Sequence, residues 1–393
     1  MATKQDDLVS LLQDIIRIAS WVDYSHQQVV HNENKLISYL IDWLKQNTNV
    51  EITKQRLPGG RFNLICKKGR PEILYLAHTD TVAPSINAEI DQLRGLIKGD
   101  RIYGRGATDM KSGLASLLWA IKNNSQANNY WACFYADEEY FFLGMKSFVQ
   151  KYSYIRPKYI ISADGSDLAL GHGCRGLIEL KIRVRGVAGH AAKGNGLNAI
   201  EGVYLVMQKL KRYLKRFYHL EMGNASVNLA YLLGGAELLE GASFQNNSLV
   251  KVGQAGNVIP DIAEFIVDIR PSSPVLTAKS IAQVIKRGLL KEGYQIDNVI
   301  VNHDLGAWYT DKKDLQPFLS MAKNANSGKL EFASPAKTGY LDLQLIWSAV
   351  GRPTAIMFGG GEGSLAHRPD EHIRITSLNK TYQFFDQVMK NLS

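Results

Sequence analysis

The segment Ile73-Leu74-Tyr75-Leu76-Ala77-His78-Thr79-Asp80 places a histidine and an acid directly after five apolar residues. Such a run is typical of a strand that is buried on both faces. His78 and Asp80 are two residues apart, so on an extended chain their side chains point the same way. A carboxylate beside a ligating histidine can hold the second ring nitrogen and fix the tautomer. The segment predicts either a strand end that carries a metal ligand or a structural His–Asp pair.

Helices and strands alternate around this segment. Apolar residues recur at helical spacing in four segments: 8–20, 33–46, 111–121 and 145–150. Strand-like apolar runs occur at 63–66, 131–136 and 159–163. This alternation predicts an α/β fold in which helices cover both faces of a sheet.

A different pattern begins after Gly176. Residues 177–184 alternate between apolar and polar, as a half-exposed antiparallel strand does. The order β-α-β-β-α-β then continues to 303, which is typical of a ferredoxin-like α+β unit. We therefore expect one domain formed by residues 1–176 and 304–393, interrupted by an inserted domain at 177–303.

The composition excludes several classes of protein. The 393 residues include 46 Lys and Arg against 37 Asp and Glu, a formal charge of +9, and 45% of them are hydrophobic. These values argue against a disordered, collagen-like or coiled-coil protein. The apolar runs are too short to span a membrane, and the polar N-terminus does not resemble a secretory signal. Three cysteines without CxxC spacing argue against a disulfide framework, so we expect a cytoplasmic protein.

The basic balance does not by itself predict a nucleic-acid partner. The densest basic stretches, 181–185 and 209–212, fit the exposed faces of a strand and of a helix. We expect no nucleic-acid binding and no membrane binding, but a bias toward anionic substrates.

Two glycine-rich stretches have different meanings. Residues 104–113 contain Asp109 and lead into a helix, where glycines let the backbone bend and bring the carboxylate to the edge of the sheet. This stretch lacks the spacing of a phosphate-binding loop. Residues 171–176 match GxGxxG, but they lead into a strand instead of a helix, so a dinucleotide site is not expected. An ordinary loop-to-helix turn is the alternative for 104–113.

Further acids and histidines follow predicted strands. Asp137, Glu138 and Glu139 are adjacent after a buried strand, where three acids repel one another and need cations nearby. Asp164 follows the next strand. The alternative for 137–139 is a solvated acidic loop, and the alternative for Asp164 is an ordinary turn. Near the C-terminus, the histidines at 367 and 372 are separated by a proline, so we expect one of them to bind metal.

Taken together, these motifs resemble the zinc-dependent M20 family of peptidases and amidohydrolases. The resemblance covers essentially the whole chain and keeps the family's order of motifs. It implies a zinc-exopeptidase-like α/β catalytic domain with a mixed sheet flanked by helices, and it implies that the insert is a lid and dimerisation domain. The family includes succinyl-diaminopimelate desuccinylase, acetylornithine deacetylase, aminoacylase and carboxypeptidase G-type enzymes.

The resemblance assigns roles to particular residues. Two Zn²⁺ ions per chain are implied, and cobalt or manganese would suit similar ligands. The implied metal ligands are His78, Asp109 as the bridge, Glu139, Asp164 and His367. For catalysis, it implies Glu138 as general base, Asp80 behind His78, and His190 of the segment Gly189-His190-Ala191-Ala192 as a group that reaches a partner subunit's active site.

Such a site would activate water between two metals, with the proton passed by Glu138 to the leaving amine and the oxyanion stabilised by His190. The resemblance further assigns Asn257 and Arg270 to the substrate's carboxylate. Arg175 and Gly339 are additional candidates for substrate binding.

The stretch Lys337-Thr338-Gly339-Tyr340-Leu341-Asp342 resembles the branch that releases lysine or ornithine from N-acylated or carrier-protein-bound forms. It departs from that branch at Tyr340 and Leu341, where small hydroxyl residues are usual. The arginine of desuccinylases is replaced by Gln344, and residues 140–142 are bulkier than usual.

We expect hydrolysis of the amide of an N-acyl amino acid, with lysine or ornithine favoured, by a homodimer that associates through its lid. The alternatives are a succinyl-diaminopimelate desuccinylase, a dipeptidase or carboxypeptidase acting on short peptides, and a non-catalytic binding module.

Overall fold

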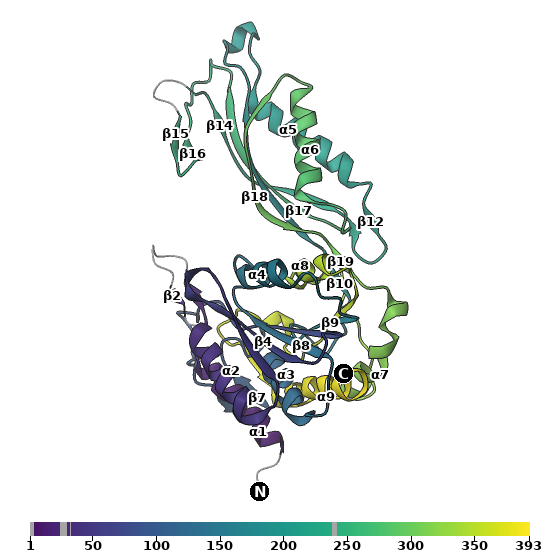
Figure 1. Cartoon of the computed structure of the whole chain (residues 1–393). Helices are drawn as coiled ribbons and strands as arrows, with labels where there is room; N and C mark the ends of the chain where they lie inside the picture. The colour runs from purple at the N-terminus through teal and green to yellow at the C-terminus, as the bar shows by residue number, and fades with distance from the viewer. Residues whose placement is uncertain (1–3, 24–29, 32, 238–241) are drawn as a thin grey trace. The chain divides into compact units, whose positions relative to one another are not determined.

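The computed structural model of the chain describes residues 4–23, 30–31, 33–237 and 242–393 (Figure 1). Its contacts divide the chain into two compact units. Unit 1 comprises the residues up to Gly173 with Tyr309–Ala333 and Leu341–Ser393, and unit 2 comprises Cys174–Trp308 and Ser334–Tyr340. The predicted insert limits, 177 and 303, lie a few residues inside these bounds. Residues 334–340 group with unit 2 by contact, although the predicted limits assign them to the other domain.

The centre of unit 1 is a six-stranded sheet in the order β20-β9-β5-β8-β4-β3. The first four strands are parallel to their neighbours, while β4 is antiparallel to both β8 and β3. Every residue of β5 is buried between parallel neighbours, which explains its continuous apolar sequence. In sheet order, the strands are Thr354–Met357, Tyr159–Ser162, Ile73–His78, Tyr130–Tyr135, Phe62–Lys68 and Glu51–Arg56.

Helices cover both faces of this sheet (Figure 1). On one face α3 packs against α1 and α9, and on the other α4 packs against α8. This arrangement confirms the predicted α/β class with a mixed sheet. The helices of unit 1 are α1 Lys4–Arg17, α2 Glu33–Asn47, α3 Lys111–Asn123, α4 Leu143–Tyr152, α7 Gln316–Ala325, α8 Leu343–Ala349 and α9 Ile375–Leu392.

Short strands complete unit 1. β1 Val22–Asp23 pairs with β2 Val30–His31, and a three-stranded sheet has the order β21-β7-β6. Its strands are His372–Arg374, Arg101–Tyr103 and Leu96–Lys98. At the limits of the two units, β10 Gly173–Cys174 pairs with β19 Trp308–Tyr309.

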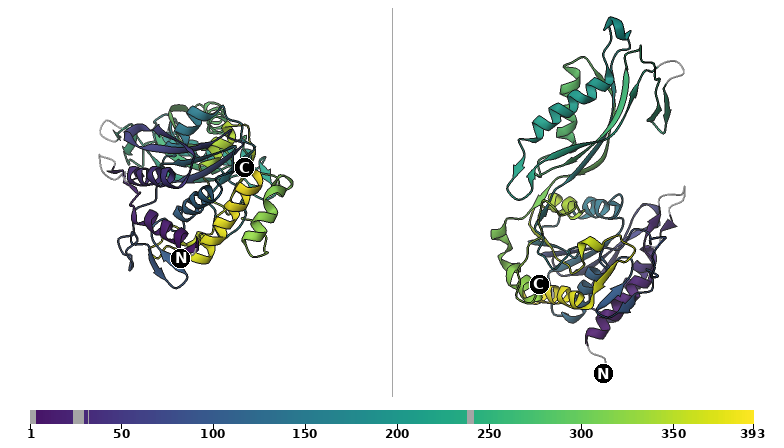
Figure 2. Two further views of the ribbon diagram at one scale, coloured as in Figure 1. Left: turned by 60° about the horizontal axis from the view of Figure 1, so that its bottom comes forward. Right: turned by 180° about the vertical axis from the view of Figure 1, so that it is seen from behind.

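Unit 2 is built on a four-stranded antiparallel sheet in the order β14-β17-β11-β18. Its chain order β11-α5-β14-β17-α6-β18 is the predicted β-α-β-β-α-β pattern. Both helices lie on the same face of the sheet (Figure 2). The bounds are β11 Leu177–Arg185, α5 Ala199–Leu214, β14 Ser226–Gly235, β17 Ile262–Arg270, α6 Ala278–Leu290 and β18 Gln295–Leu305.

Local sequence explains where the helices of unit 2 begin. The Asn198 side chain accepts a hydrogen bond from the Ile200 amide at the start of α5, and Thr277 forms a capping box with Ser280 at the start of α6. Two short hairpins add to this unit: β12 Tyr218–His219 with β13 Gly223–Asn224, and β15 Ser243–Gln245 with β16 Ser248–Lys251.

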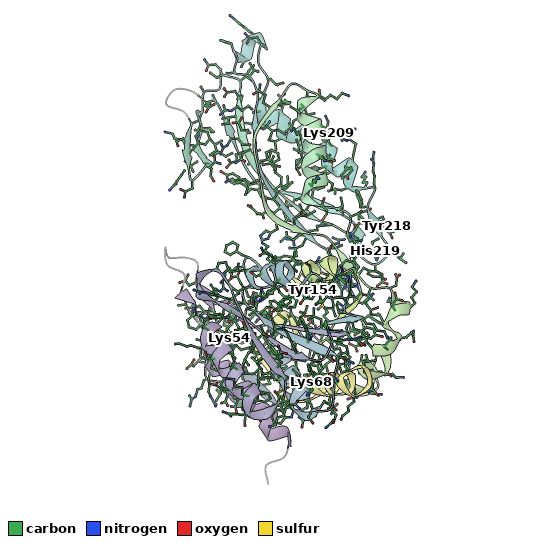
Figure 3. The ribbon with its side chains drawn as sticks, in the orientation of Figure 1. Lys54, Lys68, Tyr154, Lys209, Tyr218 and His219 are labelled. Carbon is green, nitrogen blue, oxygen red and sulfur yellow. The ribbon has the colours of Figure 1, made fainter. Side chains whose placement is uncertain are left out.

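Basic side chains are spread over several elements. Lys54, Lys68 and Lys209, labelled in Figure 3, come from β3, β4 and α5. Lys54 lies over the Phe62 ring, Lys68 donates to Asn49, and Lys209 contacts Glu292. Within the described residues, none of the helices is both long and apolar enough for a membrane span.

Candidate metal centre

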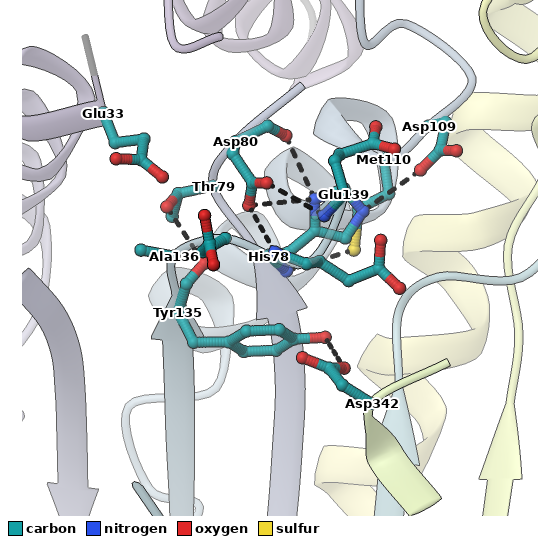
Figure 4. Close-up of polar contacts among 12 residues, drawn as sticks. Glu33, His78, Thr79, Asp80, Asp109, Met110, Tyr135, Ala136, Glu139 and Asp342 are labelled. Atoms are coloured by element: carbon teal, nitrogen blue, oxygen red, sulfur yellow. Dashed lines mark hydrogen bonds and ion pairs between the residues drawn. The ribbon is translucent and has the colours of Figure 1, made fainter. Parts of the chain in front are cut away.

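Loops at one edge of the unit 1 sheet bring acids and histidines together. Figure 4 shows one of the histidines, His78, with Asp80, Asp109 and Glu139. β5 ends at His78, Glu139 follows β8, and Asp164 follows β9. The carboxyl ends of neighbouring parallel strands meet at the same edge of a sheet, so these side chains converge. Asp109 comes from the loop before α3, and His367 from the loop after β20.

The five predicted ligands form two groups that share one carboxylate. The first group is His78, Asp109 and Asp164, and the second group is Asp109, Glu139 and His367. Within each group, one nitrogen or oxygen atom per residue lies within 4.8 Å of the others. The shared residue, Asp109, is the one that the family resemblance implies as a bridge.

The individual distances agree with this grouping. The His78 Nε2 atom lies 3.0 Å from one Asp109 carboxylate oxygen, and the His367 Nε2 atom lies 3.4 Å from the other. His367 Nε2 is also 3.2 Å from Glu139. Asp109 thus presents one oxygen to the histidine of each group, which is compatible with a carboxylate shared by two metal positions.

Asp80 contacts the site differently from the prediction. Its backbone carbonyl, not its carboxylate, lies 3.0 Å from His78 Nδ1, and the carboxylate is 3.7 Å away. The two carboxylate oxygens accept hydrogen bonds from the backbone amides of Glu138 and Glu139, each at 3.1 Å. Turning the carboxylate toward these amides satisfies both of its oxygens, so Asp80 holds the loop of Glu138 and Glu139 in place.

Burial sets the electrostatics of this edge. Burial raises the pKa of Asp80 to about 6 and that of Asp164 to about 7. For Glu138, burial is again the main cause, and the charges of Asp342 and Asp164 add to it, so its pKa lies well above the ordinary value. Carboxylates so close together need cationic compensation.

The histidines respond in the opposite sense to the same charges. Burial acts to lower the pKa of His78, but the hydrogen bond and charge of Asp109 outweigh it and hold this pKa well above 6.5. Hydrogen bonds to Asp109 and Glu139 raise the pKa of His367 to about 10. Burial would raise the pKa of Asp109, yet the bonds from both histidines bring it below its usual value. The edge therefore attracts positive charge, and its imidazole and carboxylate donors suit divalent zinc.

The first acid of the 137–139 triplet has a separate role. Asp137 is fully buried and pairs with Arg61, which also pairs with the buried Glu33 of α2. Its other oxygen accepts from the amides of Phe141 and Leu143, each at 3.2 Å. Arg61 thus supplies part of the compensation that the triplet requires, and the sequence contains no local signal for it.

Two further buried acids were not singled out as site residues. Glu371 accepts hydrogen bonds from the backbone amides of Thr108 and Asp109. Asp342 accepts a hydrogen bond of 2.8 Å from the Tyr135 hydroxyl at the end of β8 (Figure 4). Asp342 ends the stretch 337–342, and Glu371 lies between the histidines at 367 and 372, but their distant partners give no pattern in the sequence.

The predicted residues of the lid lie in unit 2. His190 is exposed, and its Nδ1 atom accepts from the Ala192 amide at 3.1 Å. The Ala191 amide donates to the carbonyl of Asn257, which joins the two loops that carry predicted residues.

The other unit 2 candidates differ in how much of their side chain is engaged. Arg270 donates from Nε and Nη2 to Asp268, each at 2.9 Å, and its guanidinium lies 5.3 Å from the Tyr340 ring centre. Arg175 donates from Nε and Nη2 to the carbonyl of Met222. At Gly339, an added Cβ would have no heavy atom within 4 Å, so this position is open.

Known proteins resemble this chain in sequence and in fold. The profile of Peptidase family M20/M25/M40 matches residues 74–391. An acetylornithine deacetylase of Buchnera aphidicola subsp. Schizaphis graminum is 26% identical, over 100% of this chain and 99% of its own.

Two solved structures have the same fold. An M20 family metallo-carboxypeptidase from Sulfolobus solfataricus superposes with a TM-score of 0.70 at 16% identity, covering 99% of both chains. A dinuclear metal-binding M20 peptidase of Bacillus subtilis gives 0.64 at 14% identity, with the same coverage. The chain belongs to peptidase family M20/M25/M40 and is a hydrolase of amide bonds.

Proposed function

We propose that the protein is a di-zinc amidohydrolase that cleaves the amide of an N-acyl amino acid, with N-acyl-ornithine or N-acyl-lysine favoured. The observation that carries this proposal is the pair of ligand groups sharing Asp109, with Glu138 beside them. His78 and Asp164 would complete one metal position, and Glu139 and His367 the other. When bound, two zinc ions polarise the scissile carbonyl and lower the pKa of water.

Glu138 has the properties of a general base that also returns a proton. Its amide is held by Asp80, so its side chain is oriented by the backbone, and it is not a member of either ligand group. We assign it to take a proton from the attacking water and to deliver it to the leaving amine.

His190 fits a role in stabilising the oxyanion. Because its Nδ1 atom accepts from the Ala192 amide, the neutral ring carries its proton on Nε2. The exposed Nε2–H is then a hydrogen-bond donor for the negative charge that develops on the substrate oxygen.

Asn257 and Arg270 would hold the substrate's carboxylate. The Nε edge of Arg270 is occupied by Asp268, while Nη1 has no hydrogen-bond partner among the described residues. This nitrogen can donate to a carboxylate. Arg175 and Gly339 are further candidates, but the Nε and Nη2 atoms of Arg175 already donate to the Met222 carbonyl.

The acyl group is better matched by an acetyl than by a succinyl group. The position where desuccinylases carry arginine is Gln344, which is buried and whose side-chain oxygen accepts from the Leu341 amide. A neutral amide used in this way offers little to a second carboxylate. A carboxypeptidase activity is the second candidate, supported by the fold shared with the Sulfolobus enzyme.

The test is to measure metal content and turnover on the same preparation. The panel should contain N-acetyl-ornithine, N-acetyl-lysine, N-succinyl-diaminopimelate and a dipeptide. Two metals per chain with preferred cleavage of an N-acetyl substrate supports the proposal. Preferred dipeptide cleavage supports the second candidate. Zinc without any turnover favours a non-catalytic binding module, and no metal after zinc reconstitution refutes the dinuclear site.

We also propose a homodimer formed through unit 2. β14 is an edge strand with half-exposed Leu229, Tyr231 and Leu232, and an exposed apolar edge can pair with a second copy. Tyr231→Lys should then reduce the mass measured by light scattering from dimer to monomer. An unchanged mass would exclude this edge.

The compartment proposed is the cytoplasm. Cys66, Cys133 and Cys174 are buried, and they form no disulfide within the described residues, which fits a reducing environment.

A further inference from the structure

The loops of Asp109 and His367 are joined by one buried ion pair, between Arg105 and Glu371. The two side chains are 2% and 0% exposed, so the pair is shielded from water and salt. Arg105 lies four residues before Asp109, and Glu371 lies four residues after His367. The pair therefore links the two segments that supply two of the three ligands of the second group.

Each partner also bonds to the backbone of a proposed ligand. One Glu371 oxygen accepts from the Asp109 amide at 3.2 Å and from the Thr108 amide at 3.0 Å. From the other side, Arg105 Nη2 donates to the carbonyl of His367 at 3.3 Å. One ion pair thus touches both ligand residues directly.

Arg105 is itself fixed on the far side. Its Nε donates to the carbonyl of Ala83 at 3.2 Å, and Nη2 donates to the Ser85 hydroxyl at 3.1 Å. The backbone amide of Gly104 also donates to the carbonyl of Glu371 at 3.0 Å. The bonds to Ala83 and Ser85 give the guanidinium a fixed orientation, which a flexible surface arginine lacks, and the Gly104 bond joins the two backbone segments.

The two ligand groups depend on this pair to different degrees. His78 is the last residue of β5 and Asp164 follows β9, and these two strands are paired within the sheet. His367 has no such support: its side chain is half-exposed, and its backbone has a φ of 65°, in the left-handed region that is unfavourable for a side chain. Its position needs an anchor outside the sheet.

We propose that the Arg105–Glu371 ion pair is a positioning element that holds Asp109 and His367 at ligand distance, and that it supports the second group more than the first, because the groups share Asp109 but only the second contains His367. The inference rests on the proposed dinuclear function. It concerns the affinity of one metal position relative to the other, and neither residue is expected to touch metal or substrate.

The test is zinc titration of the metal-free full-length chain, with bound metal counted after dialysis. Glu371→Gln keeps an oxygen for the two amides but leaves the Arg105 charge without its partner. We expect the position of the second group to lose affinity about 10–100-fold, as is typical when a group supporting a ligand is removed. The position of the first group, which shares only Asp109 with the second, should lose much less.

A matched control exists in unit 2. Arg183 and Glu264 form another buried ion pair, and Glu264 also accepts from a backbone amide, that of Leu249. Glu264→Gln removes the same charge far from the ligands along the chain. It should lower stability by a similar amount and leave both metal affinities unchanged.

Arg105→Lys is the second variant, in case Glu371→Gln folds poorly. A lysine keeps the charge but cannot bond to Glu371 and to the His367 carbonyl in the same forked geometry, so it should weaken the same position. Two unchanged affinities in a folded variant would overturn the inference, and so would equal weakening of both positions, which indicates a general structural role. Failure of the wild type to bind two metals would refute the proposed function instead.

Discussion

At the scale of single residues, Glu138 and Glu139 illustrate how neighbours acquire different tasks. Glu139 belongs to the second ligand group, while Glu138 does not belong to either group. Asp80 accepts a hydrogen bond from each of their amides, so one buried carboxylate orients both residues.

This division predicts the behaviour of Glu138→Gln. The variant keeps the size of the side chain but cannot accept the proton, so kcat should fall about 10²–10⁴-fold. Metal content should stay at the wild-type value, because no ligand is removed. Steady-state kinetics with elemental analysis checks both quantities, and loss of a metal would move Glu138 into the ligand set.

Asp342 predicts a pH dependence of stability in the metal-free protein. Burial raises its pKa to about 7, against 3.8 for an ordinary Asp, and its Oδ2 atom has no hydrogen-bond partner among the described residues. Between these pH values the folded state binds more protons than the unfolded state. Its contribution to stability is therefore fully present below about 3.8 and is lost as the pH rises through about 7.

Asp342→Asn removes this titration while keeping an oxygen for Tyr135. The free energy of unfolding of the wild type, relative to the variant, should fall by on the order of a few kcal/mol between pH 4 and pH 8. Urea denaturation at several pH values measures it. A difference that does not change with pH would contradict the assignment.

Single residues were predictable from sequence only where they lie close in the chain to a regular element. His78, Asp109, Glu139, Asp164 and His367 follow or precede regular elements, and the structure brings all five together. Arg61 and Glu371 act through partners far along the chain: Arg105 and Glu371 are 266 positions apart. No spacing rule connects such pairs, so only the fold reveals them.

At the scale of elements, close packing of α3 against the sheet brings two ligands together. Asp109 precedes α3, and Asp164 follows Ala163 at the end of β9. An added Cβ at Gly113, in the first turn of α3, would lie 2.1 Å from the carbonyl oxygen of Ala163. Glycine at this position therefore sets the separation of the helix from the strand end.

Gly113→Ala should push α3 away from Ala163. The cost expected for such overpacking is about 1–3 kcal/mol of unfolding free energy, and the first metal should bind more weakly. Gly288→Ala in α6 is the control, because its Cβ would meet only the flexible side chain of Lys209. Thermal unfolding measures the stability of the two variants, and zinc titration measures their affinity for the first metal. Equal losses of stability and affinity in both variants would exclude a special role for Gly113.

Long helices and strands were predictable because the spacing of their apolar residues follows which side of the element is buried. β5 and β11 were expected at 73–77 and 177–184, and they span Ile73–His78 and Leu177–Arg185. Hairpin strands such as β15 and β16 have only three and four residues, and most of these are exposed, so no alternating pattern marks them.

At the scale of the whole molecule, bound metal should contribute to stability. The apo state leaves buried acids close together, and a ligand that binds only the folded state stabilises it by mass action. Chelation should lower the melting temperature by roughly 5–10 °C, and added zinc should restore it. Differential scanning calorimetry provides the measurement. A melting curve that is insensitive to chelator would count against a metal-organised centre.

The position of His367 in the chain also bears on biosynthesis. Its partner in the second group, Glu139, is 228 residues earlier, and all of the segment 174–308 is translated between them. The ribosome therefore releases the ligands of the first group long before it releases the last ligand of the second. During this interval β9 also lacks its neighbour β20. A nascent chain must keep an unfinished sheet edge from pairing elsewhere, so chaperone dependence should be greatest while the insert is being synthesised.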